Sequence, residues 1–140
     1  WGSEDRKKWA VTEITEDRKP DSRLYTWVMD SDGKITSTAK ALDDSGDVLG
    51  VKSILKNVIK DQQGSLLSQS DWAIIRKADK GTAIPSNIQT WRDAIRAKAT
   101  EMENAINSAS DTDAVAALFV TADGEGKKSG ILYDWPELGE

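Results

Sequence analysis

Residues 70–96 read S-D-W-A-I-I-R-K-A-D-K-G-T-A-I-P-S-N-I-Q-T-W-R-D-A-I-R, and this stretch decides the arrangement of the chain. Ser70 or Asp71 can cap a short helix, because both side chains accept hydrogen bonds from the free N–H groups at a helix start. Gly81 can end that helix in a left-handed conformation. Pro85 fits the first turn of a second helix, where its missing N–H is not needed. The stretch therefore predicts two helices separated by a break.

The second of these helices gives the clearest periodic signal in the chain. Its apolar residues recur in steps of three and four, the spacing that places side chains on one face of an α-helix. They are Ile88, Trp91, Ile95, Ala99, Met102, Ile106 and Ala109. A similar stripe precedes the short helix, with Gln62 filling a gap in it and Gly64 weakening its late turns. Its members are Val51, Ile54, Leu55, Val58, Ile59, Leu66 and Leu67.

A last short helix is expected over residues 114–120, because an acidic residue follows a cap at Ser110 or Asp111. Residues 48–120 are therefore predicted to form a two-to-three-helix unit. Residues 121–140 are predicted to be an extended tail, in which residues 131–133 form a last extended segment.

The N-terminal part has the alternating pattern of β-strands. Residues 8–14 and 24–29 are rich in β-prone side chains with a period of two. Residues 30–33 read D-S-D-G, a turn signal, and residues 34–39 would return antiparallel. Residues 5–42 are therefore predicted to form a small antiparallel β unit. The fold class expected for the whole chain is α+β, a β-hairpin unit followed by the helical unit and the tail.

The composition excludes some classes of partner. The 140 residues contain 19 Lys plus Arg and 24 Asp plus Glu, a net charge of −5. A protein that binds duplex nucleic acid is expected to be basic, because neutralising phosphates supplies most of the affinity. The longest apolar run, residues 114–120, is far shorter than the roughly 20 residues that span a bilayer. We therefore expect neither nucleic acid nor a membrane as partner. The chain starts at Trp1 without Met, so a processed, trimmed or partial start is expected.

Chemistry is difficult to find in this sequence. With no Cys and no His, disulfides, thiolate metal sites and the commonest general base are all excluded. Residues 30–33 and 43–47 are acidic and contain Gly, but neither has the sixth-position Gly and twelfth-position Glu of an EF-hand loop. Residues 124–129 lack the spacing of a phosphate loop. We expect no catalytic residue, metal or cofactor, and a hydrolase that uses carboxylates alone is the least favoured alternative.

Tryptophan and arginine are the residues that indicate a function. Six Trp is a high count for a chain of this size, and Trp and Arg are enriched at the energetic centres of protein interfaces. The tail places a Trp-Pro pair in polar surroundings, where a partner surface is expected to cover it. The residues predicted to bind a partner are Trp72, Arg76, Trp91, Arg92, Arg96, Trp135 and Pro136. The alternative for the arginines is a solvated helix flank with Asp93–Arg96 and Lys98–Glu101 pairs.

Several of these residues also carry a resemblance to a known family. S-D-W at residues 70–72 with Arg76, then G-x-x-I-P at 81–85 and W-R-x-A-I-R at 91–96, resemble the pattern of bacteriophage tail-fibre assembly chaperones and related small tail proteins. The closing D-W-P-E at 134–137 is similar to their terminal W-P motif. The resemblance covers about half of the chain, and Trp91 stands where the family often has Tyr.

The resemblance implies a non-enzymatic role in a phage tail. The expected function is that of a structural or adaptor component of the virion tail or tail fibre, acting by protein-protein contacts. The alternatives are a tail-fibre assembly chaperone that is not retained in the virion, and an adaptor module unrelated to phage. The implied partners are other phage tail or fibre proteins, with a homo-oligomer as a further option, located in the virion or in the host cytoplasm during assembly. Client, stoichiometry and host stay open.

Overall fold

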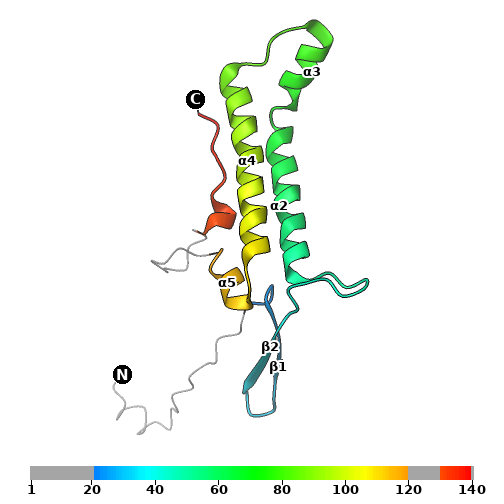
Figure 1. Ribbon diagram of the computed structural model, residues 1–140, viewed down its shortest axis with the longest axis vertical. Coiled ribbons are helices and arrows are strands. Elements are labelled where there is room, and N and C mark those ends of the chain that lie inside the picture. The colour runs from blue at the N-terminus through cyan, green and yellow to red at the C-terminus, as the bar shows by residue number, and fades with distance from the viewer. Residues whose placement is uncertain (1–20, 120–129, 140) are drawn as a thin grey trace, which may run out of the picture. The chain divides into compact units, whose positions relative to one another are not determined.

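The computed structural model describes residues 21–119 and 130–139 (Figure 1). The chain divides into two compact units, Trp1–Ala39 and Lys40–Glu140. The first contains a two-stranded sheet and the second contains the helices. The predicted α+β fold class is therefore confirmed. None of the helices in the described ranges is long and apolar enough to cross a membrane.

The first unit contains an antiparallel β-hairpin. β1 (Tyr25–Met29) pairs with β2 (Ile35–Ala39), as predicted. The Asp30 side chain accepts hydrogen bonds from two backbone N–H groups of the turn, and Gly33 has a φ of 81°, which favours glycine. The acidic turn is thus explained by its own hydrogen bonds. The predicted strand at residues 8–14 lies outside the described residues.

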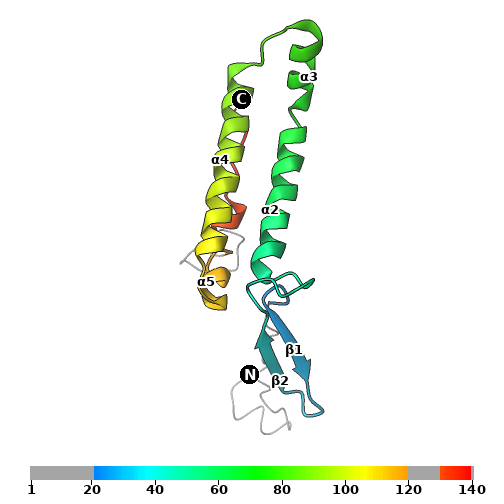
Figure 2. The same ribbon diagram turned by 45° about the vertical axis from the view of Figure 1, so that its right-hand side comes forward.

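The second unit is built on two long helices that lie side by side (Figures 1 and 2). They are α2 (Val51–Ser68) and α4 (Ser86–Ser108). Every member of the predicted α4 stripe is buried, which confirms that prediction. The α2 stripe is narrower than predicted, because Ile54 and Val58 are 47% and 43% exposed. The buried residues of α2 are Val51, Leu55 and Ile59.

A short helix, α3 (Asp71–Lys80), follows α2, and both predicted boundaries of the break are found. Gly81 ends α3 with a φ of 69°, in the left-handed region. Pro85 stands immediately before α4 as its N-cap, one residue earlier than predicted. The chain can therefore reverse between α3 and α4 without interrupting either helix.

The elements after α4 are short. α5 (Thr112–Ala116) is capped by Asp111, whose carboxylate accepts a hydrogen bond from the Ala114 N–H at 2.7 Å. The extended segment predicted at residues 131–133 is wrong, because Ile131–Tyr133 form a 3-10 turn, η1. The N–H of Leu132 donates to the Leu118 carbonyl at 3.2 Å, which holds this turn against the residues after α5. Residues 130–139 lie in the same compact unit as the helices.

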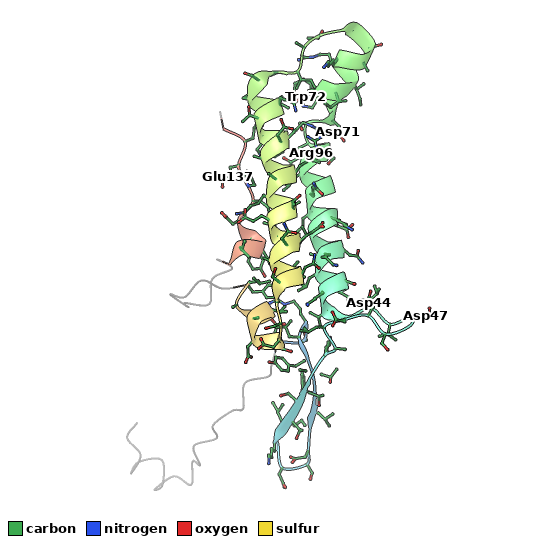
Figure 3. The ribbon with its side chains drawn as sticks, in the orientation of Figure 1. Asp44, Asp47, Asp71, Trp72, Arg96 and Glu137 are labelled. Atoms are coloured by element: carbon green, nitrogen blue, oxygen red, sulfur yellow. The ribbon has the colours of Figure 1, made fainter. Side chains whose placement is uncertain are left out.

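The start of α2 is secured by the loop before it (Figure 3). One carboxylate oxygen of Asp44 accepts from the Gly50 N–H at 2.7 Å, and the other accepts from the Ser53 hydroxyl at 2.9 Å. The N–H groups of Val51 and Lys52 donate to carbonyl groups of the same loop. Within the acidic stretch at residues 43–47, Asp44 therefore caps the start of α2, since it accepts the Gly50 N–H.

Gly50 gives the first testable prediction, because a methyl group there would overlap backbone atoms of Leu42 and Asp43. We expect Gly50→Ala to lower the free energy of unfolding by about 1–3 kcal/mol, since the loop must move away from the helix. Gly64→Ala is the matched control, because the space around Gly64 is open. It should stabilise the helix by about 0.5–1 kcal/mol. Urea unfolding measures both, and equal effects would contradict the close packing of this loop.

The Asp44 cap predicts a pH dependence of stability. Hydrogen bonds from the Gly50 N–H and then from the Ser53 hydroxyl hold the pKa of Asp44 below its ordinary value of 3.8. Because the folded pKa is lower than the unfolded one, the stabilisation is present above pH 3.8 and is lost as the pH falls through the folded value. We expect Asp44→Asn to be less stable than the wild type at pH 7, with the difference shrinking below pH 3.8. Thermal unfolding at several pH values measures this.

Asp47→Asn serves as the control for Asp44→Asn. It removes a carboxylate of the same loop for which the structure shows neither cap bond. A difference from the wild type that shrinks equally in both variants would show that the general charge of the loop, and not the cap, produces the effect.

Candidate functional site

Arg92 lies at the junction of α2, α3 and α4, and it is buried. Its Nη1 donates to the Leu67 carbonyl at 2.8 Å, to the Ser70 hydroxyl at 2.8 Å and to the Asp71 carboxylate at 3.0 Å. Only 6% of Arg92 is exposed. These bonds give a donor to acceptors at the end of α2 and at the start of α3. The positive charge of the guanidinium strengthens each bond. Arg92 is one of the residues predicted to bind a partner, and the structure places its Nη1 in bonds within the chain.

Ser70 takes part in this junction in a way that the sequence did not predict. It is the N-cap of α3, but its side chain makes no capping bond. Its hydroxyl instead donates to the Leu67 carbonyl at 3.2 Å and accepts from Arg92. Ser70 is 2% exposed, so it belongs to the core of the junction.

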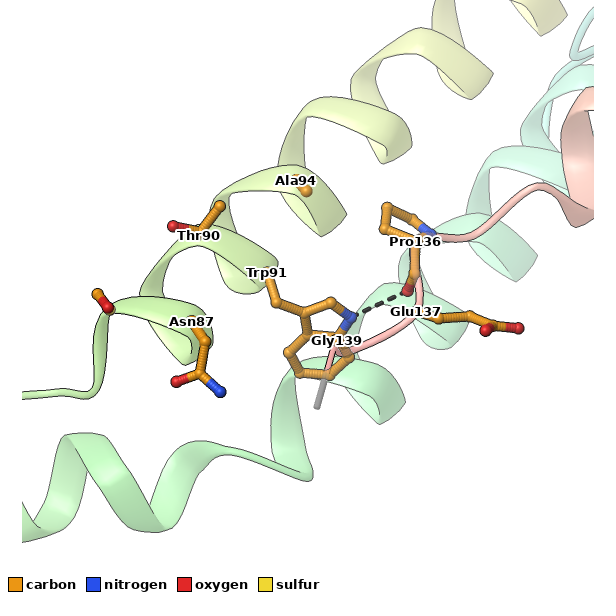
Figure 4. Close-up of a pocket in the computed structure, with 8 residues that line it drawn as sticks. Asn87, Thr90, Trp91, Ala94, Pro136, Glu137 and Gly139 are labelled. Atoms are coloured by element: carbon orange, nitrogen blue, oxygen red, sulfur yellow. Dashed lines mark hydrogen bonds between the residues drawn. The ribbon is translucent and has the colours of Figure 1, made fainter.

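Trp91 is also buried, and it holds the C-terminal segment (Figure 4). Its Nε1 donates to the Pro136 carbonyl at 2.9 Å. Trp135 is half-buried, and its Nε1 donates to the Gln62 side chain of α2 at 3.1 Å. Three of the seven residues predicted to bind a partner, Trp91, Trp135 and Pro136, therefore have partners within this chain. The indole N–H groups find acceptors inside the chain, as half-buried indoles require.

A third bond fastens the same segment to α4. Lys98 Nζ lies 2.7 Å from the Asp134 carboxylate and 3.1 Å from that of Glu101. The hydrogen bond to Asp134 raises the pKa of Lys98, and the bond to Glu101 adds to this shift. We call residues 134–136 the strap. In the sequence, Gln62 is the signal that could have indicated this contact with the strap, because a polar residue within an apolar stripe needs a polar partner.

An open groove of about 400 Å³ lies between the strap and the first turns of α4 (Figure 4). Its lining residues are Ser86, Asn87, Thr90, Trp91, Ala94, Pro136, Glu137 and Gly139. Glu137 is the single ionisable side chain among them. An acid and a base are both needed for most hydrolytic chemistry, and this groove provides no second group to act with Glu137.

The residues that could hold a metal are dispersed. Within residues 21–119 and 130–139, no group of three or more acidic side chains gathers at a spacing suited to a metal ion. Asp30 and Asp44, one from each Gly-containing loop, accept hydrogen bonds from backbone N–H groups instead.

Arg96 lies on the exposed flank of α4. Its Nη1 is 3.1 Å from the Asp93 carboxylate, which also accepts from the Gln89 side chain. The predicted pair is therefore present, as is the Lys98–Glu101 pair. Both side chains of the Arg96 pair are about half exposed or more, so the bond contributes little to stability. The structure places Arg96 with the solvated flank that was the alternative for this residue.

The remaining candidates lie on α3, which is the least covered helix of the unit. Ala73 is the only buried residue in its ten-residue length. Trp72 is 50% exposed, and the neighbouring Ile75 is 66% exposed. The guanidinium carbon of Arg76 lies 4.9 Å from the centre of the Trp72 ring, a cation–π contact. We call Trp72, Ile75 and Arg76 the α3 patch, since positions three and four apart share one face of a helix.

Arg76 has few polar contacts of its own. Its Nε–H is buried, and no acceptor for it exists in the described part of the chain. Buried N–H groups without an acceptor are uncommon in folded proteins. The α3 patch thus combines exposed apolar surface with a cation whose hydrogen-bonding capacity is incompletely used.

Comparison with known protein families, with curated protein sequences and with solved structures finds no match to this chain. What the α3 patch does has to be inferred from its own side chains.

The junction gives a stability prediction. We expect Arg92→Met to lower the free energy of unfolding by about 2–4 kcal/mol, because it leaves buried acceptors without a donor. Arg96→Met removes the same group from the exposed flank and should cost less than about 0.5 kcal/mol. Urea unfolding of both variants tests this. Similar losses in the two variants would contradict the central position of Arg92.

Proposed function

We propose that this protein is a non-enzymatic bacteriophage tail protein, a structural or adaptor component that acts by protein-protein contacts through the α3 patch. The observation that carries the contact role is the exposure of Trp72 and Ile75 on a helix that buries a single residue. An exposed Trp beside an Arg is typical of the residues that dominate binding energy at interfaces. Association with a phage tail comes from the motif resemblance alone.

The internal contacts of several motif residues support α3 as the proposed contact surface. Arg92, Trp91 and the strap are used within the chain, so they support the architecture. Trp72 keeps exposed surface on α3 and contacts Arg76, whereas Arg96, which is also exposed, is paired with Asp93. A contact role therefore falls to α3, and the shared motif would preserve the helical unit that presents it.

The chaperone alternative gains support from the size of the α3 patch. A chaperone must release its client, so a small contact surface that mixes apolar and charged groups suits it. The α3 patch is of this kind, because it lies on one short helix and includes a cation. Trp135 no longer argues for a permanent virion component, since α2 partly covers it. A permanent component would need additional buried surface elsewhere in the assembly.

Sedimentation of infected-cell lysates tests the proposal. We expect the protein to sediment with tail structures if it is a virion component, and to stay soluble with a client if it is a chaperone. Replacing Trp72 and Ile75 by Ala should reduce the bound fraction about tenfold in either case, because these side chains supply the apolar contact. Immunoblots of gradient fractions measure it.

The matched control replaces Ile54 and Val58 by Ala. These α2 residues are also exposed and apolar, but they lie outside the α3 patch. The control variant should bind as the wild type does. A wild-type protein that showed no link to infection would leave only the adaptor module unrelated to phage, and equal binding by all three proteins would remove α3 as the contact.

A further inference from the structure

We infer that the α3 patch binds the C-terminal segment of a second copy of this chain, with Leu138 on Trp72 and Ile75 and the Glu137 carboxylate on Arg76. This inference rests on the proposed function only in using α3 as the contact surface. It goes further by naming the occupant of that surface.

The chemistry of the α3 patch defines what can bind there. Its apolar part needs an apolar side chain, and Arg76 needs a carboxylate, because its guanidinium carries a charge with no ion pair in the described residues. Residues 76–80 read R-K-A-D-K, three cations and one carboxylate, so this end of α3 is basic in a chain of net charge −5. The occupant should therefore be acidic and carry an exposed aliphatic residue.

The segment that follows the strap has this chemistry. Leu138 is 46% exposed, and Glu137 beside it is exposed as well. Asp134 is paired with Lys98, whereas no ion pair or hydrogen bond engages the Glu137 carboxylate among the described residues. Because the strap is bonded to α2 and α4, Glu137 and Leu138 are presented from a fixed base, which lowers the entropy lost on binding.

The two surfaces belong to different parts of the same helical unit. In Figure 1 the C-terminal segment runs along α4, whereas α3 continues beyond the end of α2. Figure 3 places Glu137 on the α4 side and Trp72 at the start of α3. Each copy offers both a donor surface and an acceptor surface, so two copies can exchange the contact reciprocally about a two-fold axis, or further copies can add through heterologous contacts. Contacts of this kind build rings or open rows of subunits.

The area of a single contact is small, which sets the expected strength. The patch has one aromatic residue, one aliphatic residue and one cation, well below the roughly 20–30 residues a side of a stable interface. We therefore expect weak, concentration-dependent self-association. Closure of a row into a ring would strengthen it, because the closing contact forms within one assembly at a raised effective concentration.

Sedimentation velocity of the full chain from low-micromolar to millimolar concentration tests the inference. The wild type should associate reversibly. Arg76→Glu and Glu137→Arg should each weaken association about tenfold, since each places like charges opposite one another. Lys60→Glu on α2 changes the charge by the same amount as Arg76→Glu and should have no effect. Circular dichroism verifies that every variant is folded.

Mixing the Arg76→Glu and Glu137→Arg variants supplies the decisive measurement. When copies of the two variants alternate, one contact pairs the two substituted side chains with their charges exchanged. The next contact pairs the unaltered Arg76 and Glu137. Every contact then joins opposite charges, so association should return to within about twofold of the wild type.

Leu138→Ser tests the apolar half of the contact, and it should weaken association without changing its dependence on salt. A monomeric wild type, equal weakening by Lys60→Glu, or a mixture that stays dissociated would each overturn the inference. In each of these cases the proposed function would still be supported if the variant with Trp72 and Ile75 replaced lost a tail partner.

Discussion

One buried guanidinium determines where the helical unit turns. Arg92 donates at once to the last turn of α2, to the residue before α3 and to the first residue of α3. A charge removed from water requires such acceptors, since an unpaired buried cation would cost several kcal/mol. The direction of α3 relative to α2 is thus tied to a side chain of α4. The exposure of Trp72 and Ile75 follows from this direction, because α3 extends past the apolar face that α2 and α4 share.

The same constraint explains why Trp91 and Arg92 serve the fold of the helical unit. Trp91 and Arg92 are adjacent in sequence, and they serve two opposite tasks. The indole holds the strap, and the guanidinium holds the junction. Both tasks are internal, so substitution at either position would act on the fold before it acted on a partner. The exposed residues of α3 depend on this framework for their placement.

Much of this architecture could be predicted from local sequence, and the reasons are specific. The seven apolar members of the α4 stripe recur at helical spacing. Gly81 and Pro85 have backbone preferences that few other residues share. The partners of the polar side chains could not be predicted in this way. The bond from Trp135 to Gln62 joins residues 73 positions apart, and no local pattern encodes which distant acceptor an indole will find. The sequence therefore predicts a partner surface at Trp91 and Arg92, although the Trp91 indole N–H and Arg92 Nη1 donate within the chain. Ile54 and Val58 fit the helical period but lie outside the covered arc, since periodicity gives a face and not its width.

The sequence separation of the strap's bonds has a consequence for the order of folding. α2 ends at Ser68 and α4 begins at Ser86, so the contact between their facing ends closes a smaller loop, and loses less chain entropy, than either bond of the strap. The strap must close loops of 45 and 73 residues before its bonds to Trp91 and Gln62 form. The strap is therefore expected to dock late, after α2 and α4 have packed and placed Gln62 and Trp91. By the same reasoning, the strap should be the first tertiary structure to open in native-state hydrogen exchange, while the helices beneath it remain protected.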